Sequence, residues 1–555
     1  MSATIDHAKI DDVIKRNIPV FNKPGALTIR PGFKMSNGWI TDKPSIVVTV
    51  DKKLDGLPDD NKLPTSVEGV PVDVREATGL QRLRAKDPAS FQLAKVHVRD
   101  QNREPAFPLE RSLPSGNFIP AAQKTAASTS APKGPPKTPV QYTAPAGQPL
   151  KKFTKNMSLI CWASPDDGFT VLKDFLSQTK TDLTIAMYDF TSADILKEMI
   201  SVIEPGNMQF KLILDHPPRN PTANQTDDVT RTDLLDADTN AAINWALTRS
   251  DPVVTEWIYP TAYHIKVAVR DSKAFMLSSG NYNVSNQPNL AAGNAVQGSL
   301  KNADRDWHVI VLDPEMALLF KAYIDHDFAA AQNGQSAGSP ILHESIKSAM
   351  ASLQAETDQS SFKAVNNAAV SVIGKQKLFN NVPVSIQPIL TPDPGVHTSM
   401  YVDNTLALIE SATQKVYMQT QYIHPSSAAL DQDFMLLVNA LVGAVKNGLD
   451  VRLITSEFEN TPQWMEKMKE VGLDGVLKIQ QRVHNKGIVI DSKTVMVSSQ
   501  NWSADGTLRN RDAGVIIENA DIAKYYEAIF LDDWENRAKK KVTDVSQPAP
   551  GGGEG

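Results

Sequence analysis

Cysteine is almost absent from this sequence, since Cys161 is the only one among 555 residues. One cysteine cannot form an intrachain disulfide, and it argues against a structural zinc site built from thiolates. A disulfide framework is therefore excluded.

Long apolar runs are also missing. The longest apolar-looking stretch, residues 434–445, has twelve residues, contains Asn439 and is too short to span a bilayer. The first residues, MSATIDHAKIDD, are polar and acidic, without the apolar segment of a secretion signal. We therefore expect a cytoplasmic protein with no transmembrane segment, and export by a route that needs no signal stays open.

The chain carries no excess of positive charge. It has 57 Lys and Arg against 63 Asp and Glu, a net charge of −6. This balance argues against attraction of the whole surface to nucleic acid or anionic lipid, but it leaves room for a local basic groove. A hydrophobic content of 41% and a charged content of 22% are typical of globular proteins, and 555 residues suit two or three domains.

Turn-forming residues and composition divide the chain. Residues 1–107 contain two short β-branched runs, SIVVTV (45–50) and VPVDV (70–74), which predict a small β-rich α/β domain. We interpret it as an accessory module of unknown role that is suited to docking a protein partner. Residues 108–150 are rich in Pro, Ala, Ser and Thr and predict a flexible linker, and residues 543–555 predict a disordered tail.

The remaining sequence contains an internal repeat. Residues 264–281 align with residues 484–501, and ten of the eighteen aligned positions are identical, from His264/His484 to Asn281/Asn501. Most of the identical residues are polar or charged. A repeated fold would require matching hydrophobicity only, so the polar identities indicate repeated chemistry.

Strands and helices recur in the same order before each histidine. LTIAMYDF (183–190) and FKLILD (210–215) match KVYMQTQY (415–422) and DVRLITSE (450–457). Near-continuous apolar strands that alternate with helices predict mixed sheets covered by helices. We expect one lobe at 151–335, a second at 381–542, and a helical connector at 336–380.

The repeated residues suit a phosphate. His264 and Lys266 are two positions apart in a predicted strand, so their side chains project to the same side. An ammonium and an amide supply positive charge and N–H donors to phosphate oxygens. Two copies around a two-fold axis would place one imidazole on each side of the phosphorus for an in-line displacement, with no metal required.

The pattern His-x-Lys-x4-Asp followed by Ser-x-Asn resembles the phospholipase D superfamily. It reads H264-I-K266, D271 and S279-G-N281 in the first half, and H484-N-K486, D491 and S499-Q-N501 in the second. The resemblance covers roughly residues 155–540, including YMQTQYIHP (417–425), and not residues 1–107. It implies a pseudo-two-fold bilobal α/β fold, one active site between the lobes, a covalent phosphohistidine intermediate and no metal cofactor.

The resemblance also implies roles for residues. His264 corresponds to the nucleophile and His484 to the general acid, with the reverse assignment left open. The expected phosphate-binding residues are Lys266, Lys486, Asn281, Asn501, Ser279 and Ser499. We interpret Asp271 and Asp491 as structural residues of the turns in which they lie.

Two later acids are the candidates to orient the imidazoles. Aligning NADRDWHVIVLD (302–313) with LRNRDAGVIIEN (508–519) matches Asp306 with Asp512. A carboxylate on one ring nitrogen fixes the tautomer and stabilises the imidazolium. Asp306 follows its histidine by 42 residues and Asp512 follows by 28, so the first half has fourteen extra residues around LAAGNAVQGS.

The motif predicts a phosphoric diester hydrolase and leaves the substrate open. One hypothesis is hydrolysis or transfer at the distal phosphodiester of a phospholipid, with a possible membrane surface as the place of action. The alternative is a metal-independent nuclease acting on DNA or RNA, against which the acidic balance weighs. A catalytically silent scaffold is disfavoured because both histidines, lysines and asparagines are intact. GQSAG (334–338) matches a serine-hydrolase motif, but it follows a helical stretch, so we interpret it as a loop.

Overall fold

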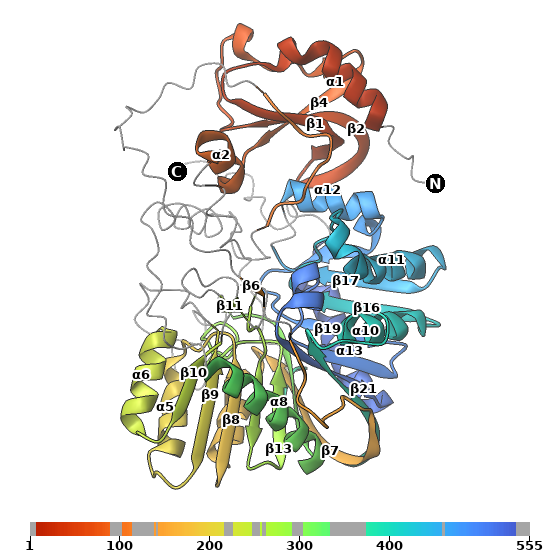
Figure 1. Cartoon of the computed structure of the whole chain (residues 1–555). Coiled ribbons are helices and arrows are strands. Elements are labelled where there is room, and N and C mark those ends of the chain that lie inside the picture. Colours follow the sequence, from red (N-terminus) through yellow and green to blue (C-terminus); the bar gives the residue numbers. More distant parts are fainter. Residues whose placement is uncertain are drawn as a thin grey trace, which may run out of the picture.

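The computed structural model describes residues 7–88, 91, 103–113, 138–139, 142–215, 226–246, 256–257, 262–290, 303–332, 373–457 and 461–539. They form a small N-terminal sheet with its helices and a much larger sheet built from two similar halves (Figure 1). The mixed α/β architecture with a small β-rich N-terminal domain is as predicted.

The N-terminal domain is a five-stranded sheet in the order β3-β4-β2-β1-β5. Its elements are α1 (His7–Phe21), β1 (Ala26–Ser36), β2 (Trp39–Val50), η1 (Asp59–Asn61), β3 (Ser66–Val67), β4 (Val70–Glu76), α2 (Gly79–Lys86) and β5 (Arg111–Ser112). Ile14 and Phe21 of α1 are fully buried with Ile29, Ile46 and Val48 of the sheet, so the helix closes an apolar core.

The large sheet has fourteen strands in the order β10-β9-β8-β12-β13-β14-β7-β15-β21-β20-β19-β16-β17-β18. The order reads the same outward from its centre in both directions, so the halves are related by a pseudo-two-fold axis between β7 and β15. The first half holds β7 (Phe153–Ser164), β8 (Asp182–Met187), β9 (Gln209–Leu214), β10 (Ala242–Trp245), β12 (Val267–Arg270), β13 (Ala274–Ser278) and β14 (Asp306–Leu312). The second holds β15 (Lys377–Thr391), β16 (Lys415–Thr420), β17 (Asp450–Thr455), β18 (Leu477–Ile479), β19 (Lys486–Ile490), β20 (Thr494–Ser498) and β21 (Asp512–Glu518).

The central strands are buried on both faces, which explains their near-continuous apolar sequences. Val267 and Val269 of β12 belong to a core shared by both halves, whereas Ala268 between them faces the outer core of the first half. In β19, Val489 faces the shared core, and Ile488 faces the outer core of the second half. The alternation of strand side chains thus supplies two cores at once.

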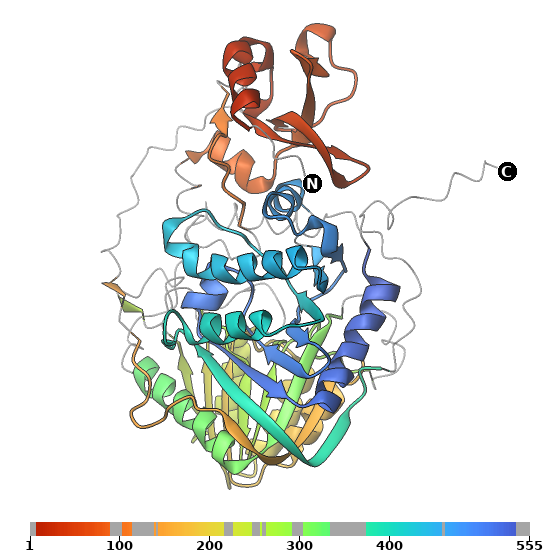
Figure 2. The ribbon, with the colours of Figure 1, turned by 90° about the vertical axis from the view of Figure 1, so that its right-hand side faces the viewer.

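Helices cover these cores (Figures 1 and 2). The first half carries α4 (Gly168–Ser177), α5 (Ala193–Ile203), α6 (Asp227–Ala237) and α8 (Pro314–Gln332). The second carries α10 (Met400–Glu410), η4 (Ala429–Asp431), α11 (Gln432–Lys446), α12 (Pro462–Val471), η6 (Asp474–Val476), η7 (Asp505–Arg509), α13 (Ala520–Asp532) and η8 (Asp533–Arg537). A separate pair of two-residue strands joins β6 (Thr138–Pro139) to β11 (Glu256–Trp257). Phe320 and Ile324 of α8 and Ile529 and Phe530 of α13 all enter the shared core. Among the helices of the described ranges, none is both long enough and apolar enough to cross a bilayer.

The acid of each motif fixes the hairpin that follows its histidine. Asp271 lies in the turn between β12 and β13, and its carboxylate accepts hydrogen bonds from the backbone N–H groups of Lys180 and Thr181 at 2.9 and 2.7 Å. Asp491 does the same in the second half, with Gln414 and Lys415 as donors, both at 2.9 Å. These carboxylates therefore anchor the hairpin turns to the starts of β8 and β16.

Several boundaries differ from the sequence analysis. The N-terminal sheet extends past residue 107, because Ser112 of β5 pairs with Thr28 and Leu113 enters the core. Residues 377–380, placed in the helical connector, are the start of β15. The rest of that connector up to residue 372, GQSAG (334–338), the stretch AAGNAVQGS (291–299) and the tail from residue 543 lie outside the described residues.

Candidate active site

The two histidines lie where the halves of the large sheet meet. His264 precedes β12, and its backbone N–H donates to the carbonyl of Arg511, from the second half, at 2.7 Å. His484 precedes β19, and its N–H donates to the carbonyl of Arg305, from the first half, at 3.0 Å. Each histidine is thus held at the seam by a strand start of the opposite lobe.

Each histidine contacts a carboxylate from the opposite half of the sheet. His264 Nδ1 lies 2.8 Å from Asp512 Oδ1, and His484 Nδ1 lies 3.0 Å from Asp306 Oδ1. The sequence analysis named both acids as candidates to orient the imidazoles, and the structure places each of them against the histidine of the opposite half. Since the carboxylate takes Nδ1, the nitrogen that can react with a substrate is Nε2 in both rings.

Ser279 and Ser499 support these acids. The Ser279 hydroxyl donates to Asp306 Oδ1 at 2.7 Å and accepts from the Trp307 backbone N–H at 3.0 Å. The Ser499 hydroxyl donates to Asp512 Oδ1 at 2.5 Å. A serine has one hydroxyl proton to donate, and here it goes to a carboxylate. In this structure both serines therefore hold the acids in place, and their expected role as phosphate ligands stays a prediction.

The lysines are buried beside the histidines. Lys266 and Lys486 are 0% and 1% exposed, and each ammonium donates to the carbonyl of its neighbouring histidine. Lys486 Nζ also lies 3.5 Å from the carbonyl of Ser279 in the other half. Burial lowers the pKa of Lys486 to about 8, against the opposing charges of nearby aspartates. The two ammonium groups thus place positive charge at the seam, where an anion can bind.

Asn281 and Asn501 occupy matching places after β13 and β20. Both are 6% exposed, and neither carboxamide oxygen has a hydrogen-bond partner within the part of the chain that the structure describes. Buried polar atoms are normally paired. The fold does not use these acceptor oxygens, and an anionic ligand would instead take the amide N–H groups of the same side chains.

The two halves form one electrostatic unit. The charge of Lys266 contributes to the lowered pKa of His484, about 4, for which burial and Lys486 are the larger causes. Both lysines also act on Asp512, whose pKa burial nevertheless raises to about 7. The lysines and histidines of the two motifs therefore lie around a common centre.

The halves are not equivalent around the acids. Asp306 Oδ2 accepts a hydrogen bond from Asn286 Nδ2 at 2.9 Å, whereas Asp512 Oδ2 has no partner among the residues described. The position that matches Asn286 is Gly506. Burial would raise the pKa of Asp306, but the charges of His484 and Lys486 outweigh it and hold that pKa below its usual range.

Tyr188 was not predicted from the motif. Its ring packs edge-on against His264 with centroids 4.5 Å apart, and Lys266 Nζ lies 5.1 Å from its centre. The matching residue of the second half is Gln421, so this aromatic contact is confined to His264. The only signal in the sequence was its position directly after the strand β8.

Two buried arginines, whose carbonyls accept from the histidine backbones, also tie the lobes together through their side chains. Arg305 pairs with Asp166 of its own half and Asp533 of the other. Arg511 pairs with Asp393 of its own half and Asp327 of the other, both at 2.8 Å. Since Arg305 and Arg511 directly precede Asp306 and Asp512, these ion pairs fix the crossed acids.

Comparisons with known proteins place the chain among phospholipase D-like sequences. A family described as "Cardiolipin synthase, PLD-like domain" matches residues 405–534. The phospholipase D of Rickettsia felis is 32% identical over 136 residues, which cover 23% of this chain and 60% of that protein. The phospholipase D of Rickettsia prowazekii is 31% identical over 181 residues, 31% of this chain and 76% of that protein. The chain thus spans about 60% of the length of the first curated relatives it matches.

Solved structures are more distant. A phosphatidylserine synthase of Haemophilus influenzae is 14% identical with a TM-score of 0.47, covering 71% of this chain and 91% of its own. The phospholipase D family member Nuc from Salmonella typhimurium is 22% identical with a TM-score of 0.23, covering 28% of this chain and 96% of its own. On the curated relative of which it covers 76% at 31% identity, the chain belongs to the phospholipase D superfamily.

Proposed function

We propose that this protein is a phosphodiesterase that hydrolyses or transfers the distal phosphodiester of a phospholipid through a covalent phosphohistidine. The observation that carries the proposal is the pair of crossed His–Asp contacts, His264–Asp512 and His484–Asp306, at one lysine-rich centre. Two oriented imidazoles supply a nucleophile and an acid–base group for in-line displacement.

The first step is attack on phosphorus. His264 Nε2 forms the N–P bond while the P–O bond to the leaving alcohol breaks, and His484 gives its proton to the departing oxygen. Asp512 holds the proton on Nδ1 of His264 and stabilises the positive charge that the ring acquires. Lys266 and Lys486 neutralise the non-bridging oxygens, with Asn281 and Asn501 as amide donors.

The second step reverses the roles. His484, now neutral, takes a proton from water or from an alcohol, whose oxygen attacks phosphorus. The N–P bond breaks, and His264 returns to its starting state. Water yields a phosphatidic acid, and an alcohol yields a new phosphatidyl ester, so hydrolysis and transfer differ only in the acceptor.

The electrostatics link the acid to the substrate. Burial and Lys486 lower the pKa of His484 to about 4. A bound phosphodiester brings a negative charge that offsets Lys486, so His484 gains its proton when the substrate arrives. We assign the attack to His264, following the order implied by the family resemblance.

A lipid substrate is supported by the relatives, which are themselves named phospholipase D. The net charge of −6 weighs against polynucleotides, since nucleic-acid binding relies on neutralising many phosphates. A nuclease activity at the same site is the alternative that the experiment must separate.

The test incubates the full chain with labelled phosphatidylcholine and a primary alcohol in the presence of chelator, beside His264→Asn. A phosphatidyl-alcohol product that is absent with the variant supports both the lipid substrate and the covalent intermediate. Cleavage of labelled single-stranded DNA or RNA without lipid turnover would retain the mechanism and replace the substrate. No turnover of either would overturn the proposal.

A further inference from the structure

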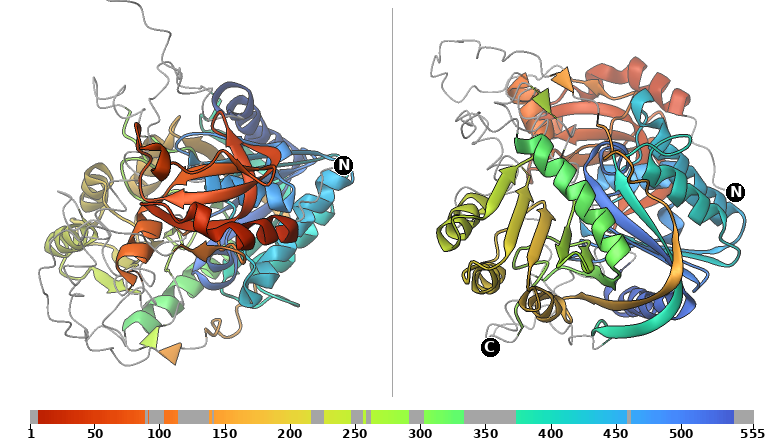
Figure 3. Two further views of the ribbon diagram at one scale, coloured as in Figure 1. Left: turned by 90° about the horizontal axis from the view of Figure 1, so that it is seen from above. Right: turned by 60° about the horizontal axis from the view of Figure 1, so that its bottom comes forward.

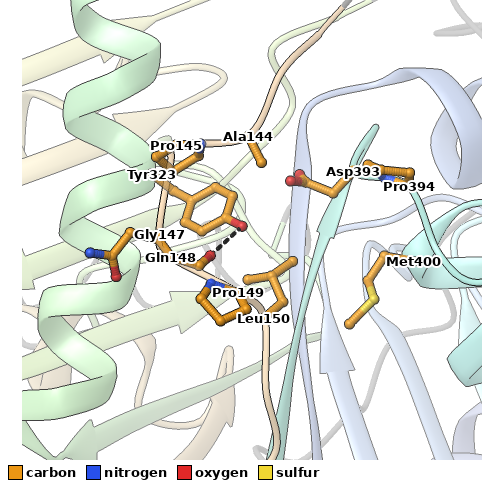
Figure 4. Close-up of a pocket in the computed structure, with 10 residues that line it drawn as sticks. All are labelled: Ala144, Pro145, Gly147, Gln148, Pro149, Leu150, Tyr323, Asp393, Pro394 and Met400. Atoms are coloured by element: carbon orange, nitrogen blue, oxygen red, sulfur yellow. Dashed lines mark hydrogen bonds between the residues drawn. The ribbon is translucent and has the colours of Figure 1, made fainter.

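One pocket is lined by none of the residues of the two histidine motifs. It has a volume of about 490 Å³ and is formed by residues 144–150, Tyr323 of α8, the turn at Asp393–Pro394 and Met400 of α10. Figure 4 shows the Tyr323 ring and the Asp393 carboxylate on opposite sides of the opening, with Pro149, Leu150 and Met400 below. The walls are thus mostly apolar, with an aromatic ring and one carboxylate.

The Asp393 carboxylate is buried, and only one of its two oxygens has a hydrogen-bond partner. Asp393 is 2% exposed, and its Oδ2 receives the Arg511 guanidinium at 2.8 Å. Its Oδ1 has no hydrogen-bond partner among the residues that the structure describes. An unpaired buried carboxylate oxygen is costly, and this one lines a pocket large enough for a ligand.

The matching cluster of the first half has the same unpaired oxygen, since Asp166 Oδ1 also has no hydrogen-bond partner among the residues described, but it holds one more cation. There Asp533, which pairs with Arg305, has a second cation, because Arg537 Nε lies 3.3 Å from its other oxygen. Counting four residues beyond the matching Asp327 leads to Ala331. The group of Arg511, Asp327 and Asp393 therefore holds one more negative than positive charge.

The backbone segments that lie next to Asp166 and Asp393 also differ between the halves. In the first half, a Cβ added to Gly374 would lie 2.3 Å from Asp166 Oδ2, so the backbone there sits directly on the carboxylate. In the second half, residues 144–150 leave the pocket over Asp393. The two-fold repeat thus places one carboxylate directly under backbone and the other, itself buried, in the wall of a pocket.

We propose that this pocket binds a small organic cation, an ammonium group on a short apolar body, with its charge at Asp393 Oδ1. The apolar part would contact Pro149, Leu150 and Met400. The Tyr323 hydroxyl donates to the carbonyl of Gln148 at 2.9 Å, which fixes the ring as a wall, and an aromatic face attracts cations.

A proton is the natural competitor of this cation. Burial raises the pKa of Asp393 to about 6, with Arg511 opposing the shift and Asp327 adding to it. The other groups around Arg511 are the phenols of Tyr142 and Tyr323, whose pKa values burial raises further above neutrality. A permanent cation should therefore bind more tightly as the pH rises from about 5 to 7, as Asp393 loses its proton.

The experiment is calorimetric titration of the full chain with choline chloride, beside 3,3-dimethylbutan-1-ol, its uncharged analogue of the same shape. We expect saturable binding of choline and at least about tenfold weaker binding of the alcohol, a difference of about 1.4 kcal/mol. Vesicles of phosphatidylcholine and of phosphatidylglycerol separate a lipid headgroup from a free amine as the source of the cation.

Variants locate the site. Asp393→Asn should weaken choline binding about tenfold or more, and Met400→Trp should block it by filling the pocket without changing the ion cluster. Glu410→Gln, an exposed acid on the same helix, is the matched control and should bind as the parent does. Choline binding that survives Met400→Trp, or no choline binding by the parent chain, would overturn the proposal.

Discussion

Each imidazole of this site depends on a carboxylate from the other half of the chain. A single buried acid that fixes a tautomer is worth orders of magnitude in rate, because the reacting nitrogen must carry a lone pair at the right moment. The contacts His264–Asp512 and His484–Asp306 therefore predict that a change of Asp512 acts like a change of His264. A change of Asp306 should act like a change of His484.

The first prediction uses a phosphodiester with a 4-nitrophenol leaving group, which needs little protonation. Asp512→Asn should slow the first step by about 10²–10⁴, as His264→Asn does. Asp306→Asn should spare that step and slow only the release of the phosphohistidine, as His484→Asn does. Burst kinetics of nitrophenol and mass spectrometry of the quenched protein separate the two. A burst in Asp512→Asn with none in Asp306→Asn would contradict the crossed assignment.

The second prediction concerns anion binding and pH. Burial lowers the pKa of Lys486 to about 8, so above pH 8 this side chain loses its charge. Inhibition by sulfate, which does not titrate in this range, should weaken above pH 8, approaching about tenfold per pH unit. Lys486→Met should bind sulfate weakly with a flatter pH dependence. Equal sulfate affinity at pH 7 and pH 9.5 in the parent would exclude this role of Lys486.

At the scale of elements, the repeated motif divides into catalytic and structural parts. His264 and Lys266 lie at the seam, while Asp271 lies at the far end of β12 in the turn. Both Asp271 and the following Ser272 have a φ of 52°, a left-handed conformation that is costly for residues other than glycine. The carboxylate offsets this cost through hydrogen bonds from the start of β8.

The third prediction tests this division with Asp491→Ala. The change removes hydrogen bonds from Thr413, Gln414 and Lys415 and should lower the free energy of unfolding by about 1.5–3 kcal/mol. Because these hydrogen bonds hold the pKa of Asp491 below its ordinary value, the difference should shrink as acid protonates the parent. Urea unfolding measures the loss, and kcat/KM per folded molecule should stay unchanged. A large loss of kcat/KM at unchanged stability would assign Asp491 to the site.

The elements around the motif were predictable, but their pairing was not. Apolar strands such as residues 183–190 and 415–422 carry their own periodicity, and the identities of the repeat point to a two-fold site. An exact repeat, however, fits pairing of Asp306 with either histidine equally well, and only the docking of the lobes decides. The roles of Ser279 and Tyr188 also depend on neighbours that are distant in sequence, so no local pattern reveals them.

At the scale of the whole molecule, the N-terminal domain is packed on the second lobe. Figure 1 shows it above α12, and the view from above in Figure 3 shows it covering that lobe. Phe33, Trp39 and Ile40 share one apolar core with Met465 and Met468 of α12. The domain that the sequence analysis interpreted as suited to docking a protein partner therefore packs in part against the chain's own second lobe.

A buried carboxylate lies at the centre of that contact. Glu466 of α12 is 0% exposed and receives Arg30 and Arg75 of the N-terminal sheet at 2.6 and 2.8 Å, together with the backbone N–H of Phe33 at 3.1 Å. Burial alone would raise its pKa, but the two arginines outweigh burial and lower it. At neutral pH the ionised carboxylate therefore neutralises two guanidinium groups. Without it, Asp73, which accepts from Arg75 at 2.9 Å, would be their remaining acidic neighbour.

The last prediction is that Glu466→Gln loosens the N-terminal domain. Removing one partner of a buried ion pair leaves the others uncompensated and costs about 3–5 kcal/mol, so unfolding by urea should begin at a lower concentration and limited proteolysis should release the N-terminal domain. Glu470→Gln, on the same helix but partly exposed, is the matched control.

The histidines lie at the seam of the large sheet rather than at this contact, so turnover of a small diester per folded molecule should be retained. Because the lowered pKa of Glu466 adds stability that acid removes, the two proteins should converge in stability as the pH falls below about 4. If Glu466→Gln and Glu470→Gln unfold alike at neutral pH, the ion cluster does not hold the domain, and the shared apolar core alone must do so.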